Sequence, residues 1–99
     1  MYRTVITARI KNGRLQEAIP AAKAIADYLN EKCHLKVDVF LRQFGPGGMI
    51  HWTSEYQDLA AVEKLNEQVM ADQGFWTVVN KASETFVEDS TESILLKSV

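Results

Sequence analysis

The chain has 99 residues, a formal net charge of −2 and 46% hydrophobic residues, which is the size and composition of one globular domain. The slightly acidic balance argues against a protein that mainly binds nucleic acid, because such proteins usually carry a basic excess. No apolar run approaches the roughly 20 residues that span a bilayer, and no apolar leader segment is expected. A single cysteine, Cys33, cannot form an internal disulfide. We therefore expect a cytoplasmic protein without membrane contact.

The first two elements are a strand and a helix. Residues Tyr2 to Ile10 alternate between two faces, which predicts a strand that ends at Asn12-Gly13. Apolar residues then recur at helical spacing from Leu15 to about Lys32, which predicts an amphipathic helix. Pro20 lies inside that pattern and predicts a kink or a later start, because proline removes one backbone hydrogen bond.

A β-hairpin is expected next. Leu35 to Phe44 and Met49 to Tyr56 both alternate, and Gly45-Pro46-Gly47-Gly48 joins them, with its middle two residues as the turn. One face of this hairpin is apolar and carries Val37, Val39, Leu41, Ile50, Trp52 and Tyr56. The other face mixes apolar and charged side chains, namely Phe40, Phe44, Met49, Asp38, Arg42, His51 and Glu55.

The last third of the chain predicts helices and a final strand. Residues Asp58 to Asp72 carry one apolar stripe, and Gly74 is expected to break the helix there. Phe75 to Phe86 predicts a second helical piece, followed by an acidic loop over 84–93. A short strand is expected from Ile94 to Val99.

The element order is strand, helix, strand, strand, helix, strand, and it predicts one α+β domain over residues 1–99. This order is typical of the ferredoxin-like βαββαβ fold, with a four-stranded antiparallel sheet and helices on one face. Right-handed crossovers place the first and third strands in the middle. The other sheet face would expose apolar residues, namely Val5, Phe40, Phe44, Met49 and Leu95. Because monomers seldom leave such patches open, we expect a homodimer with the two sheets stacked face to face.

Several motifs resemble a known group of proteins. They are His51 to Tyr56, Leu59 to Glu63, Ala71-Asp72 and Phe75-Trp76. These motifs resemble the second half of NIPSNAP-type proteins and, more broadly, the dimeric α/β-barrel superfamily, which includes antibiotic-biosynthesis monooxygenase-like proteins. The resemblance implies a ferredoxin-like homodimer whose two sheets form a barrel. It implies no single activity, because the superfamily includes cofactor-free oxygenases, haem degraders and isomerases.

The haem-degrading members of that superfamily use an asparagine on the first strand and a histidine on a helix of the second half. Here the first strand offers Thr4 and Thr7, and no histidine lies between Asp58 and Ser93. The resemblance fails at these positions, so no haem and no other cofactor is expected.

Arg42 and His51 are the candidate catalytic pair. If the turn is as short as expected, they lie directly opposite each other, with Cβ atoms roughly 4.5–5.5 Å apart. They could hold a carboxylate, an enolate or a phenolate, with the histidine as proton donor or base. The competing interpretation is that His51 only forms contacts across the dimer. The residues expected to bind a ligand beside this pair are Thr7, Arg9, Phe40 and Thr53.

Two further pairs of side chains lie on the same face. The same register places Asp38 opposite Glu55, which is unfavourable unless Arg3 or Arg9 offsets the like charges. His51 and Glu55 lie about 13 Å apart along one strand, too far to share an ion. No metal site is therefore expected.

The leading hypothesis is a homodimeric barrel that binds a small aromatic or anionic molecule in its sheet-lined interior. Cofactor-independent monooxygenase-like or isomerase-like chemistry is compatible with it, and the sequence does not decide whether the protein is an enzyme. The alternative is a non-catalytic dimerisation or interaction module with a barrel filled by side chains. Binding of single-stranded RNA is disfavoured, because the central strands lack the aromatic residues on which bases stack.

Overall fold

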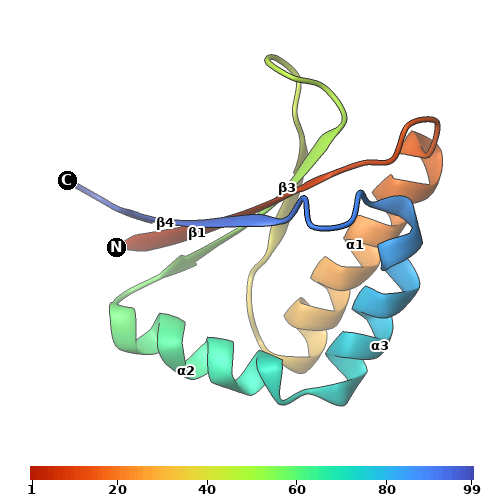
Figure 1. Ribbon diagram of the computed structural model, residues 1–99. Coiled ribbons are helices and arrows are strands. Elements are labelled where there is room, and N and C mark those ends of the chain that lie inside the picture. The colour runs from red at the N-terminus through yellow and green to blue at the C-terminus, as the bar shows by residue number, and fades with distance from the viewer.

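The computed structural model describes all 99 residues, and its four strands form one sheet. Figure 1 shows the helices on one side of this sheet. The elements in chain order are β1 (Tyr2–Arg9), α1 (Leu15–Lys32), β2 (Asp38–Leu41), β3 (Met49–Tyr56), α2 (Leu59–Met70), α3 (Gln73–Ala82), the 3-10 turn η1 (Ser83–Thr85) and β4 (Glu92–Lys97). All strand pairs are antiparallel, in the order β2-β3-β1-β4. The predicted ferredoxin-like α+β fold is confirmed, including the central position of the first and third strands.

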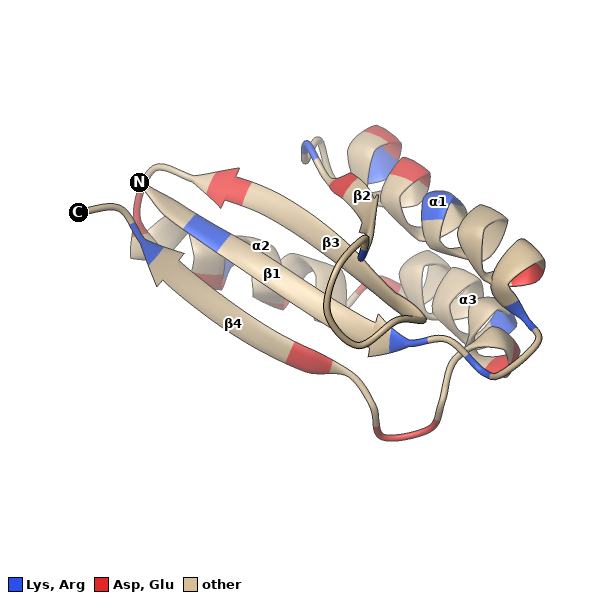
Figure 2. Ribbon diagram, turned by 90° about the horizontal axis from the view of Figure 1, so that it is seen from above, with Lys and Arg blue, Asp and Glu red and all other residues tan.

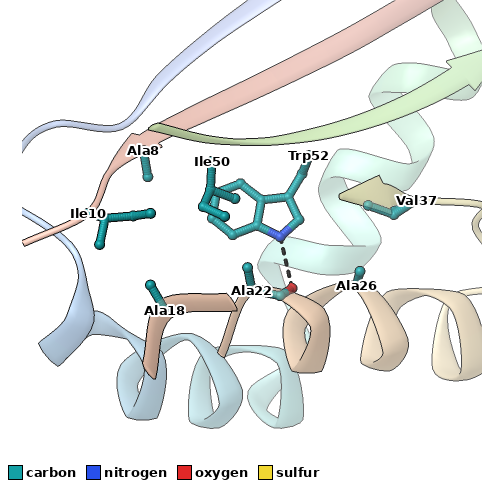
Figure 3. Packing of buried hydrophobic residues seen from close by; sticks show 8 residues of the cluster. All are labelled: Ala8, Ile10, Ala18, Ala22, Ala26, Val37, Ile50 and Trp52. Atoms are coloured by element: carbon teal, nitrogen blue, oxygen red, sulfur yellow. Dashed lines mark hydrogen bonds between the residues drawn. The ribbon is translucent and has the colours of Figure 1, made fainter. Parts of the chain in front are cut away.

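Helix α1 packs closely on β3 through small side chains. Ala18, Ala22 and Ala26 recur every four residues, so they share one helix face, and all three are buried. Because alanine is short, the α1 backbone lies near the sheet, and the indole Nε1–H of Trp52 donates a hydrogen bond to the Ala22 carbonyl oxygen at 3.0 Å (Figure 3). Ile50 fills the space beside this contact and is 1% exposed. This half of the sheet therefore carries the hydrophobic core.

The link between α1 and α3 is a polar contact. The hydroxyl of Tyr28 donates a hydrogen bond to Oδ1 of Asp72 at 2.6 Å. This bond raises the pKa of Tyr28 to about 12 and lowers the pKa of Asp72, whose carboxylate also accepts from the Phe75 backbone N–H. A side chain at Gly74 would overlap the Tyr28 hydroxyl. Glycine is needed at this position for space, because its φ is not in the left-handed region.

Two details of the helices differ from the expectations. Helix α1 begins at Leu15 and continues through Pro20, so of the two expected effects of the proline the later start is wrong. Gly74 lies in the first turn of α3 rather than at the end of the preceding helix. The chain instead breaks at Asp72, whose side chain caps α3, just as Asp58 caps α2 by accepting from the Ala61 backbone N–H at 2.8 Å.

The hairpin is also shorter and shifted. Strand β2 covers only Asp38–Leu41, whereas the sequence predicted Leu35 to Phe44. Leu41 pairs with Ile50, two residues away from the predicted partner Trp52. The turn is longer than two residues, because the Arg42 backbone N–H still donates to the Met49 carbonyl oxygen at 3.0 Å and residues 43–48 form the connection. A shift of two residues keeps every side chain on its predicted face.

The last strand begins earlier than expected, and this changes which side chains it exposes. β4 starts at Glu92 and pairs Leu95 with Thr4 and Ile94 with Val5. Leu95 therefore points to the helix side of the sheet, and the prediction that it lies on the open face was wrong. Ile94 and Leu96 lie on the open face instead. No helix is both long and apolar enough to cross a bilayer.

Candidate functional site

The open face of the sheet is the region that the sequence singled out. Figure 2 looks onto this face, with the strands in front of the helices and most charged residues toward the strand ends. Large apolar side chains are exposed there: Phe40 is 54% exposed and Phe44, on the β2–β3 turn, is 90% exposed. Ile94 and Leu96 expose further apolar surface on β4, at the opposite edge of the sheet.

The predicted site residues all come from alternating positions that share this face. They are Thr7, Arg9, Phe40, Arg42, His51 and Thr53. Phe40, rather than Arg42, lies directly opposite His51, and Thr7 is the partner of His51 on β1. The predicted direct opposition of Arg42 and His51 was therefore wrong, because the turn is longer. The two side chains still meet along the diagonal between neighbouring pairs.

His51 is held by hydrogen bonds from both sides. The Nε–H of Arg42 donates to Nε2 of His51 at 3.2 Å, so Nε2 is the unprotonated nitrogen. Nδ1 therefore carries the proton and donates to Oγ1 of Thr7, at 2.7 Å. Burial lowers the pKa of His51 and the Arg42 charge lowers it further, which favours this neutral form.

The two carboxylates of the face are not adjacent. Asp38 pairs with Thr53, and Glu55 pairs with Arg3 on β1 and forms an ion pair with it. The predicted opposition of Asp38 and Glu55 was wrong for the same reason of register. Arg3, which was expected to offset a carboxylate here, does contact Glu55. Both partners are about half exposed, so the pair adds little to stability.

A larger site lies on the other side of the sheet, and the sequence did not predict it. A cavity of about 780 Å³, partly open to solvent, lies between β1, β3 and β4 above and the three α-helices below. It is lined by 30 residues, of which 20 are hydrophobic. Val62, Leu65 and Val69 of α2 face it, and only Val69 is buried. Helix α2 is therefore separated from the sheet by the cavity, whereas α1 packs directly against the sheet.

Polar groups lie at the two ends of this cavity. Thr4, Ser54 and Tyr56 place three hydroxyl groups in its wall on the sheet side. At the other end, near the Ile10–Phe86 bridge, the wall includes charged side chains from the loop before β4 and one lysine. The charged residues of the wall are Lys11, Glu84, Glu88 and Asp89. Five aromatic residues line the cavity. Four of them form two edge-to-face pairs, Trp52 with Phe86 and Phe75 with Trp76.

The apolar stripe of residues Asp58 to Asp72 could not reveal this cavity. A stripe of Val62, Leu65 and Val69 has the same spacing whether it packs on a sheet or faces a hollow. One signal was present: Tyr56 and Ser54 place hydroxyl groups on the apolar face of the hairpin. No group of three or more histidine, cysteine or acidic side chains is arranged to hold a metal ion.

Solved structures with the same fold include NIPSNAP family proteins and antibiotic biosynthesis monooxygenase-like proteins. An uncharacterized NIPSNAP domain protein from Burkholderia xenovorans has a TM-score of 0.78 and 17% sequence identity, over 100% of this chain and 95% of that one. A NIPSNAP family protein of unknown function from Agrobacterium tumefaciens has a TM-score of 0.75 and 20% identity, over 99% and 87% of the two chains. A structure described as an antibiotic biosynthesis monooxygenase has a TM-score of 0.72 and 20% identity, over 100% and 99%.

No protein-family model matches the sequence, and no curated protein matches it either. Identities of 17–20% make the likeness to these structures a statement about the fold. The chain has the ferredoxin-like fold of NIPSNAP-family and antibiotic biosynthesis monooxygenase-like proteins, as its motifs predicted.

Proposed function

We propose that the protein binds a small, largely apolar aromatic molecule in the cavity between the sheet and the helices. The observation that carries this proposal is a cavity of about 780 Å³ in which 20 of 30 lining residues are hydrophobic. Ligand sites typically measure about 300–1,000 Å³ and combine apolar walls with a few placed polar groups. The edge-to-face aromatic pairs in the wall support a flat ring as the ligand.

The proposed ligand lies within one chain, whereas the sequence led us to expect it between the stacked sheets of two chains. On the open face, Phe40 and Phe44 stand out into solvent and enclose nothing by themselves. The cavity is walled by strands and helices of one chain and is partly open to solvent. A concave, largely apolar space supports ligand binding better than an open sheet face does.

Equilibrium dialysis with 2-ethylnaphthalene tests the cavity, because this probe is aromatic and uncharged and has no hydrogen-bonding group. We expect the wild type to bind it and Val62→Phe to bind it severalfold more weakly, since the larger side chain occupies the space. Lys64→Phe is the matched control: it places the same side chain on the exposed face of α2, outside the cavity wall. Equal affinity of the wild type and Val62→Phe would show that this cavity is not the site.

We also propose that a second copy of the chain covers the open face. The exposed Phe40, Ile94 and Leu96 make an apolar surface that a two-fold partner would bury, and the charges at its rim are of both signs. Light scattering after gel filtration should give a dimer for the wild type and a monomer for Phe40→Glu. The control is Gln68→Glu, which adds the same charge on α2 away from the sheet. A monomeric wild type would contradict the dimer.

A second binding place is supported by the contact between Arg42 and His51. The guanidinium group is hydrogen-bonded to the imidazole through Nε, and Arg42 also borders a depression of about 390 Å³ with both polar and apolar walls, beside the β2–β3 turn. An anionic or aromatic molecule would bind here in the interior between two stacked sheets. The test is dialysis with 2-naphthoate: a loss of binding in His51→Ala that Val62→Phe does not reproduce supports this place. Unchanged affinity in a folded His51→Ala would remove it.

Catalysis requires more than these contacts supply. Cofactor-free monooxygenase-like or isomerase-like chemistry at His51 would need a nitrogen that faces a substrate, but both ring nitrogens are hydrogen-bonded to Thr7 and Arg42. The proposed function is therefore ligand binding without proton transfer. If neither 2-ethylnaphthalene nor 2-naphthoate binds and the wild type is dimeric, the remaining interpretation is a non-catalytic dimerisation module.

A further inference from the structure

Three hydroxyl groups form a chain in the sheet-side wall of the cavity. Oγ1 of Thr4 and Oγ of Ser54 lie 2.7 Å apart across the β1–β3 pair, and Oγ of Ser54 donates to the Tyr56 hydroxyl oxygen at 3.1 Å. Thr4, Ser54 and Tyr56 all line the cavity, and Ser54 is buried. The alternation of β3 places Ser54 and Tyr56 on the same face, which brings their hydroxyl groups together.

The direction of this chain is set by the number of protons. A serine hydroxyl has one proton, and that of Ser54 is used in the bond to Tyr56. Thr4 must therefore be the donor in its bond with Ser54. The Tyr56 oxygen receives a hydrogen bond, while its own phenolic proton makes no hydrogen bond within the protein. Tyr56 is thus a hydrogen-bond donor in a wall in which 20 of the 30 residues are hydrophobic.

The charges around the cavity decide which acceptor such a donor would meet. Its wall contains three carboxylates, Glu84, Glu88 and Asp89, and one cation, Lys11. All four lie at the end near Ile10 and Phe86, roughly 20 Å along the strand from Thr4. A carboxylate ligand bound at Tyr56 would therefore have no cation beside it. An anion buried without a partner is costly, whereas a carbonyl oxygen is satisfied by a phenol donor.

We propose that the Tyr56 hydroxyl, oriented by Ser54 and Thr4, anchors an uncharged aromatic ligand through a carbonyl oxygen. This inference rests on the proposed cavity function and adds the chemical class of its ligand. Ser54 and Thr4 are positioning residues in this arrangement, because they act on the ligand only through Tyr56. The aromatic walls contact the ring, and the hydroxyl chain fixes which end of the molecule points toward α2.

The test compares 2-acetylnaphthalene with 2-ethylnaphthalene, which have nearly the same shape and differ by one carbonyl oxygen. The quantity measured by dialysis is the ratio of their two affinities, since a general change in folding or packing affects both. In Tyr56→Phe we expect this ratio to fall about fivefold to tenfold, the effect of one lost hydrogen bond. Ser54→Ala should lower the ratio less, because Tyr56 keeps its donor but loses its orientation.

Tyr2→Phe is the matched control, because Tyr2 is the partner of Tyr56 on β1 and does not line the cavity. It should leave the ratio unchanged. If the wild type binds both probes and Tyr56→Phe leaves the ratio unchanged, this inference is wrong and the cavity function stands. Binding of 2-naphthoate that depends on both Tyr56 and Val62 would also overturn it, since it would show an anion at this donor. If the wild type binds neither uncharged probe, the cavity function fails and this inference fails with it.

Discussion

The two halves of the sheet are packed in different ways. Under β3, α1 approaches through Ala18, Ala22 and Ala26, and the backbone of the helix itself accepts a hydrogen bond from the sheet. Under β1 and β4, α2 presents larger side chains across a cavity, and every residue of β4 is exposed. The same fold therefore contains a dense half and a hollow half, and the difference lies in which helix has a continuous stripe of small residues.

This contrast indicates that the half under α1 supplies most of the stability and the half under α2 supplies the proposed ligand site. Dense packing under α1 gives the main cluster of buried apolar residues. The hollow half is then free to carry a ligand space, at the cost of fewer buried contacts. A ligand would add the packing that α2 lacks, and we expect the most ligand-dependent stability in α2 and β4.

The largest expected effect is the difference in free energy of unfolding lost when one side chain is truncated in the dense half and one in the hollow half. Ile50→Ala removes a side chain that is 1% exposed and should lower the free energy of unfolding by about 2–5 kcal/mol. Leu95→Ala removes one that is 44% exposed on the hollow side and should cost less than about 1 kcal/mol. Urea denaturation followed by circular dichroism measures both. Similar losses for the two variants would remove the distinction between dense and hollow halves.

The next effect concerns the attachment of α3 to the dense half. Gly74→Ala places a methyl group where the Tyr28 hydroxyl lies, so the hydrogen bond from Tyr28 to Asp72 must break. We expect a fall of several degrees in the midpoint of thermal unfolding. Gly47→Ala is the control, because a side chain there meets nothing and its φ is not positive. A Gly74→Ala protein as stable as the wild type would show that Tyr28 can move without loss.

A smaller effect is expected at the start of α2. Asp58→Ala removes the carboxylate that caps the first turn and should cost about 1 kcal/mol. Because α2 has little packing on the sheet, its amides should exchange with solvent faster in this variant. Glu63→Ala removes an exposed carboxylate from the same helix without touching the cap, and it should leave exchange unchanged. Equal exchange in both variants would mean that packing, rather than the cap, holds α2.

The smallest effect is a pH dependence on the open face. The pKa of His51 is lowered from 6.5 by burial and by Arg42, so the unfolded chain binds the proton first. Stability should therefore fall as the pH drops below 6.5, until the lowered pKa of the folded state is reached. His51→Asn should lose this part of the pH dependence, while His34→Asn, in an exposed position, should keep it. Urea unfolding at pH 7.5 and pH 5.5 compares them; an identical pH response of His51→Asn and wild type would contradict the assignment.

Much of the fold could be predicted from local patterns. The alternation of β1 and β3 and the apolar stripe of α1 depend on nearest neighbours in sequence, and the structure confirms them. The hairpin register could not be predicted, because Gly45 and Gly48 allow a long turn as readily as a short one. The faces were nevertheless correct, since a shift of two residues preserves them.

The candidate site was predicted unevenly for a related reason. Thr7, Arg42 and His51 share a face in either register, so their common face followed from alternation alone, whereas their contacts depend on the register. The cavity depends on how far α2 stands from the sheet, and a sequence pattern carries no such distance. Leu95 was assigned to the wrong face because alternation within a strand does not show which of its two faces meets the helices, and this is set by the pairing of Leu95 with Thr4 on β1.

The two tryptophans of the chain, Trp52 and Trp76, both line the cavity. Trp52 is buried with its indole nitrogen bonded to α1, whereas Trp76 is 39% exposed beside Phe75. Tryptophan fluorescence, excited selectively over tyrosine, therefore originates from the walls of one cavity, and we expect bluer emission from buried Trp52 than from Trp76. The molecule contains its own optical reporter, and the Trp76→Phe variant would leave only the tryptophan signal of Trp52.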